Sequence, residues 1–165
     1  MLKPDSLRAA LAAVDPALAA DPAQLIMWIP QGAIASPITP SFSFSYSYQL
    51  NIFLPGYARH QAPLMIAILQ WLRVQQPDLL QPGKDAIAFE ADFLDNATVD
   101  LELRLQLTED VRAVKRPDGG FDMEFLNEPD PLFGDDLGIA GIDPVPDLAN
   151  LWFGGERLLP DAPLP

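Results

Sequence analysis

The chain has 165 residues, of which 49% are hydrophobic, so it is long enough for one domain with a core and short for two. It has no cysteine, which excludes disulfides, a thiolate nucleophile and cysteine-bound metals, and favours a reducing compartment. Its net charge of −13 opposes nonspecific binding to nucleic acid, because phosphate binding needs clustered lysine and arginine. We also expect no secretory signal and no membrane span, since no run reaches about 18 apolar residues.

The acidic charge is concentrated toward the C-terminus. Residues 1–116 hold 12 acidic and 9 basic side chains, a net charge of −3, whereas residues 117–165 hold 11 acidic and 1 basic, a net charge of −10. The latter segment also contains 8 of the 18 prolines. Such a composition is typical of a poorly folded extension. We therefore expect one folded domain over residues 1–128 and an acidic, proline-rich extension over 129–165.

The first third predicts two short helices and a strand. Pro4, with Asp5 or Ser6 as N-cap, indicates a helix that ends at Val14, and residues 17–20 indicate a second small helix or turn. Residues 25–29 are apolar at every position, which is typical of a buried strand. Residues 30–32 then predict a turn, and residue 34 the start of a return strand.

Residues 41–53, SFSFSYSYQLNIF, alternate small polar with large apolar side chains. This period of two predicts a half-buried strand with aromatic residues on one side and serines on the other. Four aromatic side chains carry roughly 600–1000 Å² of surface, which is too much to leave in water on a soluble monomer. We expect a helix over residues 63–76, which contains Trp71 and is bounded by Pro63 and Pro77, to cover the aromatic side.

Two further pairs of strands follow. Apolar residues occupy the odd positions of 87–93 and again of 99–107, and Asp95-Asn96 between them predicts an antiparallel hairpin. Residues 112–116 and 121–125 predict another hairpin around residues 117–120. The expected fold class is α+β, a mainly antiparallel sheet with two or so helices packed on one face, plus an extended C-terminal arm.

The sequence carries no recognisable catalytic, cofactor or metal constellation. There is no phosphate loop, no nucleophile elbow and no zinc helix, and the single histidine, His60, is expected on the surface. Three carboxylates, Asp92, Asp95 and Asp100, could meet around a turn as an acidic hydrolase or cation site. Alternating polar positions on a solvated sheet explain them equally well.

Two segments are candidate interfaces. The small side chains of Ser43, Ser45 and Ser47 would let another surface approach closely, although an ordinary solvated face fits them too. Leu151, Trp152 and Phe153, within residues 151–159 of the extension, are too apolar to stay in water. We expect this segment to dock either on its own domain or on a neighbouring subunit by strand addition.

Four blocks in order, MLKPDSLRAAL, SFSFSYSYQLNIF, ILQWLRVQQPDLL and FEADFLDNATVDLELRLQLTEDVRA, closely resemble the phage tail completion protein R (GpR) family of contractile-tailed temperate phages. The resemblance covers most of residues 1–128. In the second of these blocks, the family usually has one or two charged residues on the polar side of the strand, where this chain has serine.

The resemblance implies a structural protein with a tail-terminator-like fold, not an enzyme. It implies a ring, usually hexameric, that caps the head-proximal end of the tail tube, ends elongation and enables head joining. The implied partners are further copies of the chain, the tail tube and sheath proteins, the head-tail connector and another tail completion protein, without nucleic-acid specificity or a membrane. The implied location is the virion tail, after assembly in the host cytoplasm. The alternative is a small apolar-ligand binding module between the aromatic strand and its helix.

Overall fold

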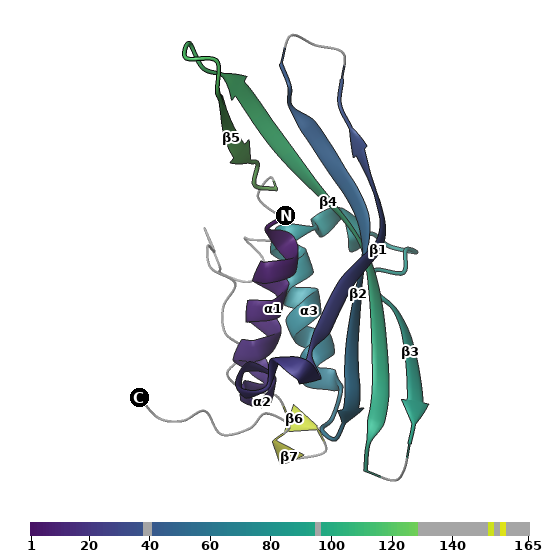
Figure 1. Cartoon of the computed structure of the whole chain (residues 1–165). Coiled ribbons are helices and arrows are strands. Elements are labelled where there is room, and N and C mark those ends of the chain that lie inside the picture. The colour runs from purple at the N-terminus through teal and green to yellow at the C-terminus, as the bar shows by residue number, and fades with distance from the viewer. Residues whose placement is uncertain (38–40, 95–96, 129–151, 154–155, 158–165) are drawn as a thin grey trace.

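The structure is a computed structural model that describes residues 1–37, 41–94, 97–128, 152–153 and 156–157 (Figure 1). It confirms the α+β class, with a mainly antiparallel sheet and helices on one face. In chain order the elements are α1 (Lys3–Val14), α2 (Pro16–Ala20), the 3-10 turn η1 (Pro22–Gln24), β1 (Ile26–Ala35), β2 (Phe44–Tyr57), α3 (Ala62–Gln75), the 3-10 turn η2 (Pro77–Leu79), β3 (Ala88–Phe93), β4 (Val99–Lys115), β5 (Phe121–Phe125), β6 (Trp152–Phe153) and β7 (Glu156–Arg157).

The main sheet has five strands in the order β1-β2-β4-β3, and β5 pairs with the far end of β4. All pairings are antiparallel. The hairpin of β3 and β4 confirms the prediction, but residues 99–107 and 112–115 belong to one strand of 17 residues rather than to two strands. Along one edge of β4, β3 pairs with residues 99–104 and β5 with residues 111–115, which leaves residues 105–110 between them without a strand partner on that edge.

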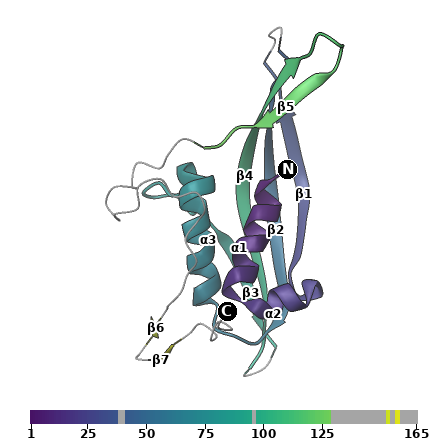
Figure 2. The same cartoon turned by 90° about the vertical axis from the view of Figure 1, so that its left-hand side faces the viewer.

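Helices α1 and α3 lie side by side against one face of this sheet (Figures 1 and 2). Their apolar sides and the inward-facing strand residues form one core, whose most deeply buried members include Leu7, Leu11, Leu50, Ile52, Leu64, Ile68, Trp71, Leu72, Leu101, Leu103 and Leu105. Trp71 is 1% exposed, and its Nε1 donates to Ser6 Oγ at 3.0 Å. Ser6 therefore joins α3 to α1 and is not the predicted N-cap, since α1 begins without a side-chain cap. Among the described residues no helix is long and apolar enough to cross a bilayer.

The helices cover only part of the sheet. With 14 residues α3 is about 21 Å long, whereas the 17 residues of β4 extend over roughly 56 Å. In Figure 1 the upper end of the sheet accordingly projects beyond both helices. We call this end the wing, and it comprises residues 31–35, 41–47 and 111–125.

The serine-aromatic tract is a strand, as its period of two predicts, but its aromatic side is not buried throughout. Tyr48 is 4% exposed and lies in the core, Phe44 and Tyr46 are half-buried, and Phe42 is 62% exposed. The prediction that α3 covers all four aromatics is therefore wrong for the wing. The short helix does not reach that far, so the first half of the tract is left for another surface to cover.

Strand β1 corrects two predictions. Residues 30–32 are not a turn, because one strand runs through them with a bulge between Trp28 and Gln31. Pro30 is tolerated there because β1 is an edge strand and a bulge needs no ladder donor. Nor is the strand buried at every position, since Ile26 is 44% and Trp28 40% exposed on the side away from the helices.

Candidate interaction surfaces

The three candidate serines lie on β2 or just before it. Ser43 Oγ accepts a hydrogen bond from the backbone N–H of Ala113 at 3.1 Å, so it ties the start of β2 to β4. Ser45 Oγ donates to Asp110 Oδ1, and Ser47 is exposed opposite Thr108. Ser43 and Ser45 thus have bonds within the sheet, which gives them a structural role. Their role at an interface stays a prediction.

Below the serines, the outward face of the sheet carries a ladder of polar pairs. Gln49 Oε1 accepts from Gln106 Nε2 at 3.1 Å, and Asn51 Nδ2 donates to Glu102 Oε1 at 3.1 Å. Arg104 donates to Glu102 at 2.9 Å and to Glu90 at 2.7 Å. These hydrogen bonds, to Glu102 and then to Glu90, raise the pKa of Arg104 above its usual value. The outward face is therefore charged on β4 and β3, although the serines themselves are not.

Of the three candidate carboxylates, two come together. Asp92 on β3 lies directly opposite Asp100 on β4, and Asp95 lies outside the described residues. Asp100 Oδ1 already accepts the backbone N–H of Gly56 at 2.7 Å. A hollow of about 500 Å³ beside them is bordered by Phe53, Glu90, Ala91, Asp92, Asp100 and Glu102. In the part of the chain that the structure describes, no group of three or more His, Cys, Asp or Glu side chains is arranged to hold a metal ion.

The space between β2 and α3, where a small apolar ligand would bind, is occupied by side chains. Leu50, Ile52, Leu64, Ile68 and Trp71 are each at most 1% exposed and belong to one contiguous core. A hollow of about 470 Å³ near α3 is on its outer side, bordered by Ile66, Leu69, Gln70, Arg73, Pro77 and Leu80. The structure thus favours a solid core over the ligand-binding alternative at this place.

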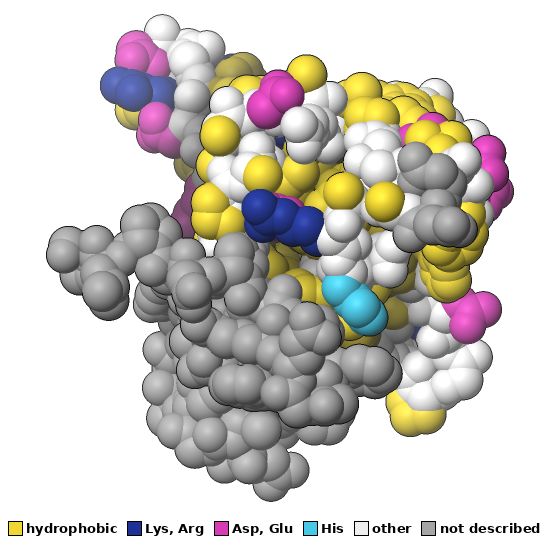
Figure 3. All heavy atoms as spheres, turned by 90° about the horizontal axis from the view of Figure 1, so that it is seen from below, with side chains coloured by type: hydrophobic (Ala, Val, Ile, Leu, Met, Phe, Trp, Pro, Cys, Tyr) yellow, Lys and Arg dark blue, Asp and Glu magenta, His cyan; other side chains and the backbone are white. Residues whose placement is uncertain are grey.

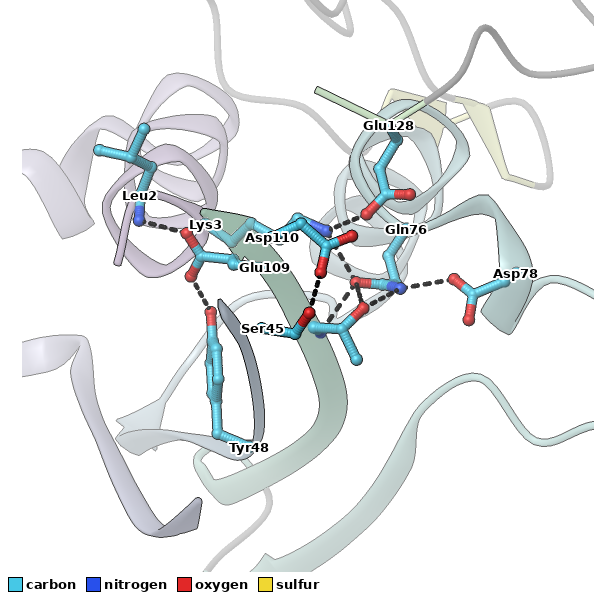
Figure 4. A network of polar contacts seen from close by, with 10 residues as sticks. Leu2, Lys3, Ser45, Tyr48, Gln76, Asp78, Glu109, Asp110 and Glu128 are labelled. Carbon is cyan, nitrogen blue, oxygen red and sulfur yellow. Dashed lines mark hydrogen bonds and ion pairs between the residues drawn. The ribbon is translucent and has the colours of Figure 1, made fainter. Parts of the chain in front are cut away.

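A buried polar network lies where the wing joins the helix-covered part of the sheet (Figure 4). Glu109, 4% exposed, accepts a hydrogen bond from the backbone N–H of Leu2 at 2.6 Å and another from the Tyr48 hydroxyl. Burial raises the pKa of Tyr48 well above its usual range, and the hydrogen bond to Glu109 raises it further. The network fixes the start of α1 to the centre of the sheet.

Gln76, directly after α3, extends the network to the open edge of β4. Its Oε1 accepts from the Thr108 backbone N–H at 3.0 Å and from Lys3 Nζ at 2.8 Å, and its Nε2 donates to Thr108 Oγ1 at 3.0 Å. Lys3 also forms an ion pair with Glu128 at 2.7 Å. Gln76 therefore takes the place of a strand in the gap between β3 and β5, and Lys3 joins Glu128 to the first turn of α1.

Two groups of exposed apolar side chains lie at opposite ends of the described sheet. The wing patch consists of Ile34, Phe42, Phe121 and Met123, which are 66%, 62%, 44% and 70% exposed. The β3 patch consists of Phe89, Phe93 and Leu94, which are 65%, 74% and 57% exposed. Hydrophobic side chains are also exposed on the face of the described structure that Figure 3 shows. Exposed aromatic groups of this extent usually mark an interaction site.

Comparison with known proteins identifies the family. The sequence model of the P2 phage tail completion protein R (GpR) family matches residues 1–129. The chain is also 34% identical over 159 residues to the tail completion protein R of Escherichia phage P2, a match that covers 94% of this chain and 96% of that protein. This chain belongs to the GpR family. No solved structure matches it.

Membership in the GpR family confirms the resemblance carried by the four sequence blocks. The family match ends at residue 129, whereas the match to the phage P2 protein extends over most of the chain. The division into a domain over 1–128 and an extension over 129–165 stays a prediction.

The predicted docking segment of this GpR protein falls largely outside the described structure. Leu151 is not described, whereas Trp152–Phe153 pairs with Glu156–Arg157 in a two-stranded sheet of its own. Where this segment docks therefore stays a prediction.

Sequence reasoning missed the network around Glu109 and Gln76. A signal for Glu109 was present, since it interrupts the odd, apolar positions of β4 between Leu107 and Val111. Gln76 gave no such signal, because a glutamine at a helix end is ordinary. Its role depends on a gap between two strands that only the sheet pairing reveals.

Proposed function

We propose that this protein is a structural component that completes the tail of a phage, or of a phage-derived particle, during assembly. The observation that carries the proposal is the 34% identity, over nearly the whole of both chains, to a tail completion protein. The described domain is consistent with a structural role, because its deepest polar groups bond one another and serve to fasten the fold.

In the finer form of the proposal, several copies form a ring at the head-proximal end of the tail tube. Such a ring ends tube elongation and presents a surface for head joining, and a hexamer would match the usual symmetry of tails. The edges of the sheet and the two exposed apolar patches support this form, since a cyclic ring repeats one interface between unlike surfaces until it closes. The partners would then be the tail tube and sheath, the head-tail connector and another tail completion protein.

The net charge of −13 supports a passive relation to the genome. If acidic groups line the opening of the ring, they repel the DNA that passes through it and keep it from adhering. A ring with a neutral or basic lumen would refute this part of the proposal.

Tail assembly with the protein omitted and then added back tests the function. Without it we expect tails of irregular length that fail to join heads, and the added protein should restore both properties. Tails of correct length that join heads in its absence would defeat the proposal.

A further inference from the structure

The two exposed apolar patches lie on the same side of the sheet but at opposite ends of it. Phe89 and Phe93 pair with inward-facing Leu103 and Val99, and Met123 pairs with inward-facing Ala113. Both patches thus face the side on which the helices lie. Val99 and Ala113 are separated by roughly 45 Å of strand, so one copy cannot bring its own patches together.

The wing patch is a preformed surface. The rings of Phe42 and Phe121 meet edge to face with their centroids 5.1 Å apart, and these residues come from opposite sides of β4. The contact joins the start of β2 to β5. Because two chain segments hold it in place, the patch is ordered before any partner arrives, and ordering costs little on binding.

The combined size of the patches suits a subunit contact. Phe42, Phe121, Phe89 and Phe93 leave roughly 370–610 Å² in water, at about 150–250 Å² for a whole aromatic side chain. That is about a third to a half of the roughly 1,200 Å² at the lower end of specific interfaces. The aliphatic members of both patches add to it.

Charge disfavours the pairing of two like β3 patches. On the other side of the same strands, Glu90 lies opposite Glu102 and Asp92 opposite Asp100, and Arg104 is the cation that the structure pairs with this set. Two such edges brought together would place like charges side by side. The wing is instead balanced in charge, because its cations Arg112, Lys115 and Arg116 are matched by Asp118, Asp122 and Glu124. It therefore repels an acidic β3 edge less than a second β3 edge would.

We propose that the wing patch of one copy binds the β3 patch of the next copy. The contact is heterologous, because it joins two different surfaces. Each copy can therefore bind one neighbour through its wing patch and another through its β3 patch, and repetition of the same contact builds a ring or a helix. The inference deepens the proposed ring, and it rests on that function only for the closure of the series around the tail.

Cross-linking tests the contact cleanly because the chain has no cysteine of its own. Full-length Phe93→Cys and Phe121→Cys variants, both at exposed positions, are treated with a short bismaleimide, singly and as an equal mixture. We expect dimers in the mixture and almost none in either variant alone. The double variant should give a ladder that stops at the number of copies in the ring. Leu69→Cys, 40% exposed on the outer side of α3, mixed with either variant is the matched control and should give no dimer.

The same reaction is run on concentrated protein and on tails assembled with the variants, so that copies joining only on the tube are also captured. Efficient dimers of Phe121→Cys alone would show a wing-to-wing contact and overturn the proposal. So would a purely intrachain product in the double variant, or the absence of mixed dimers from both preparations. If mixed dimers form but the added protein does not restore tails, the subunit contact stands and the proposed function is refuted. If tails are restored but no mixed dimers form, the function stands and the contact is refuted.

Discussion

At the scale of single residues, Glu109 is the feature that departs most from the pattern of its strand. A buried carboxylate is expensive unless it is bonded, and Glu109 accepts one bond from Leu2 and one from Tyr48. The strand accepts this acidic residue because the backbone of α1 and a strand hydroxyl both donate to it. The core therefore includes a pair of buried hydrogen bonds to Glu109, which the apolar alternation of β4 does not predict.

Replacing Tyr48 by phenylalanine tests the hydrogen bond between its hydroxyl and Glu109. Removing the hydroxyl leaves a buried carboxylate with one donor fewer, so we expect the free energy of unfolding to fall by about 1.5–3 kcal/mol. Urea unfolding measures it. Tyr46→Phe is the matched control, since Tyr46 lies two residues away on the same side and is half-buried, and it should change the value by less than about 0.5 kcal/mol. Equal effects of the two changes would contradict a role for the bond.

Two tyrosines are buried beside carboxylates: the Tyr48 hydroxyl donates to Glu109, and the Tyr57 hydroxyl donates to Asp15 Oδ2 at 3.1 Å. Burial, and then the neighbouring carboxylates Glu109 and Asp15, raise the pKa of Tyr48 and Tyr57 well above the value of about 10 in an unfolded chain. Folding therefore favours the protonated hydroxyls, so their contribution to stability is complete below about pH 10 and is lost as the pH rises above it.

Urea unfolding between about pH 9 and 11 should show this alkaline fall, and the Tyr48→Phe/Tyr57→Phe variant should show a weaker one. The single Tyr46→Phe variant should keep the full fall. An unchanged dependence in the double variant would mean that other groups cause it.

At the scale of elements, the sequence predicted most where a pattern was strict. The hairpin of β3 and β4 followed from two alternating runs around a turn, and α3 from an apolar stripe between Pro63 and Pro77. The continuity of β1 was missed because residues 30–32 have turn composition, whereas pairing with β2 carries the strand through them by a bulge. Local propensity identifies Pro30 as a residue that disfavours a strand. It does not show that pairing with the neighbouring strand β2 outweighs this preference.

Gln76 shows how a side chain completes an element. Changing Gln76 to alanine leaves the Thr108 N–H and the Lys3 ammonium without this acceptor, so we expect a loss of about 2–4 kcal/mol in the free energy of unfolding. Hydrogen exchange gives a local measurement, because the Thr108 amide should lose protection more than the amides paired with β2. Gln75→Ala, one residue earlier in α3, is the control and should leave Thr108 protected. An unaltered Thr108 amide in the Gln76 variant would show that the edge is held otherwise.

At the scale of the whole molecule, the layers could be predicted but the extent of their overlap could not. The serine-aromatic tract predicts that another element packs on its aromatic side, and the apolar helix α3 is the element that the sequence predicts for this position. A rise of about 1.5 Å per residue in a helix against about 3.3 Å in a strand means that α3 covers less than half the length of β4. The surplus length becomes the wing, so the candidate interface follows from a mismatch between element lengths rather than from a motif.

The predicted extension over residues 129–165 is the other part of the molecule with unassigned apolar residues. The residue before it, Glu128, pairs with Lys3 at 2.7 Å beside the first turn of α1. The 22 residues between Glu128 and Leu151 could span up to roughly 75 Å if extended, which exceeds the roughly 56 Å length of β4. Leu151, Trp152 and Phe153 can therefore reach a neighbouring copy, and we predict that they dock there.

Truncation before Leu151 should weaken subunit association and leave the domain folded. Association of the purified protein is measured by sedimentation over a range of concentrations, and its incorporation is measured in assembled tails. Folding is measured by urea unfolding, and the free energy of unfolding should match that of the full chain. Removal of residues 160–165 alone, which spares the apolar segment, is the matched control and should assemble normally. Loss of stability on truncation would indicate docking on the chain's own domain, and unchanged assembly would refute the arm's role between subunits. Because the folded domain retains the wing and the Lys3–Glu128 pair in both truncations, a difference between them can be assigned to the apolar segment itself.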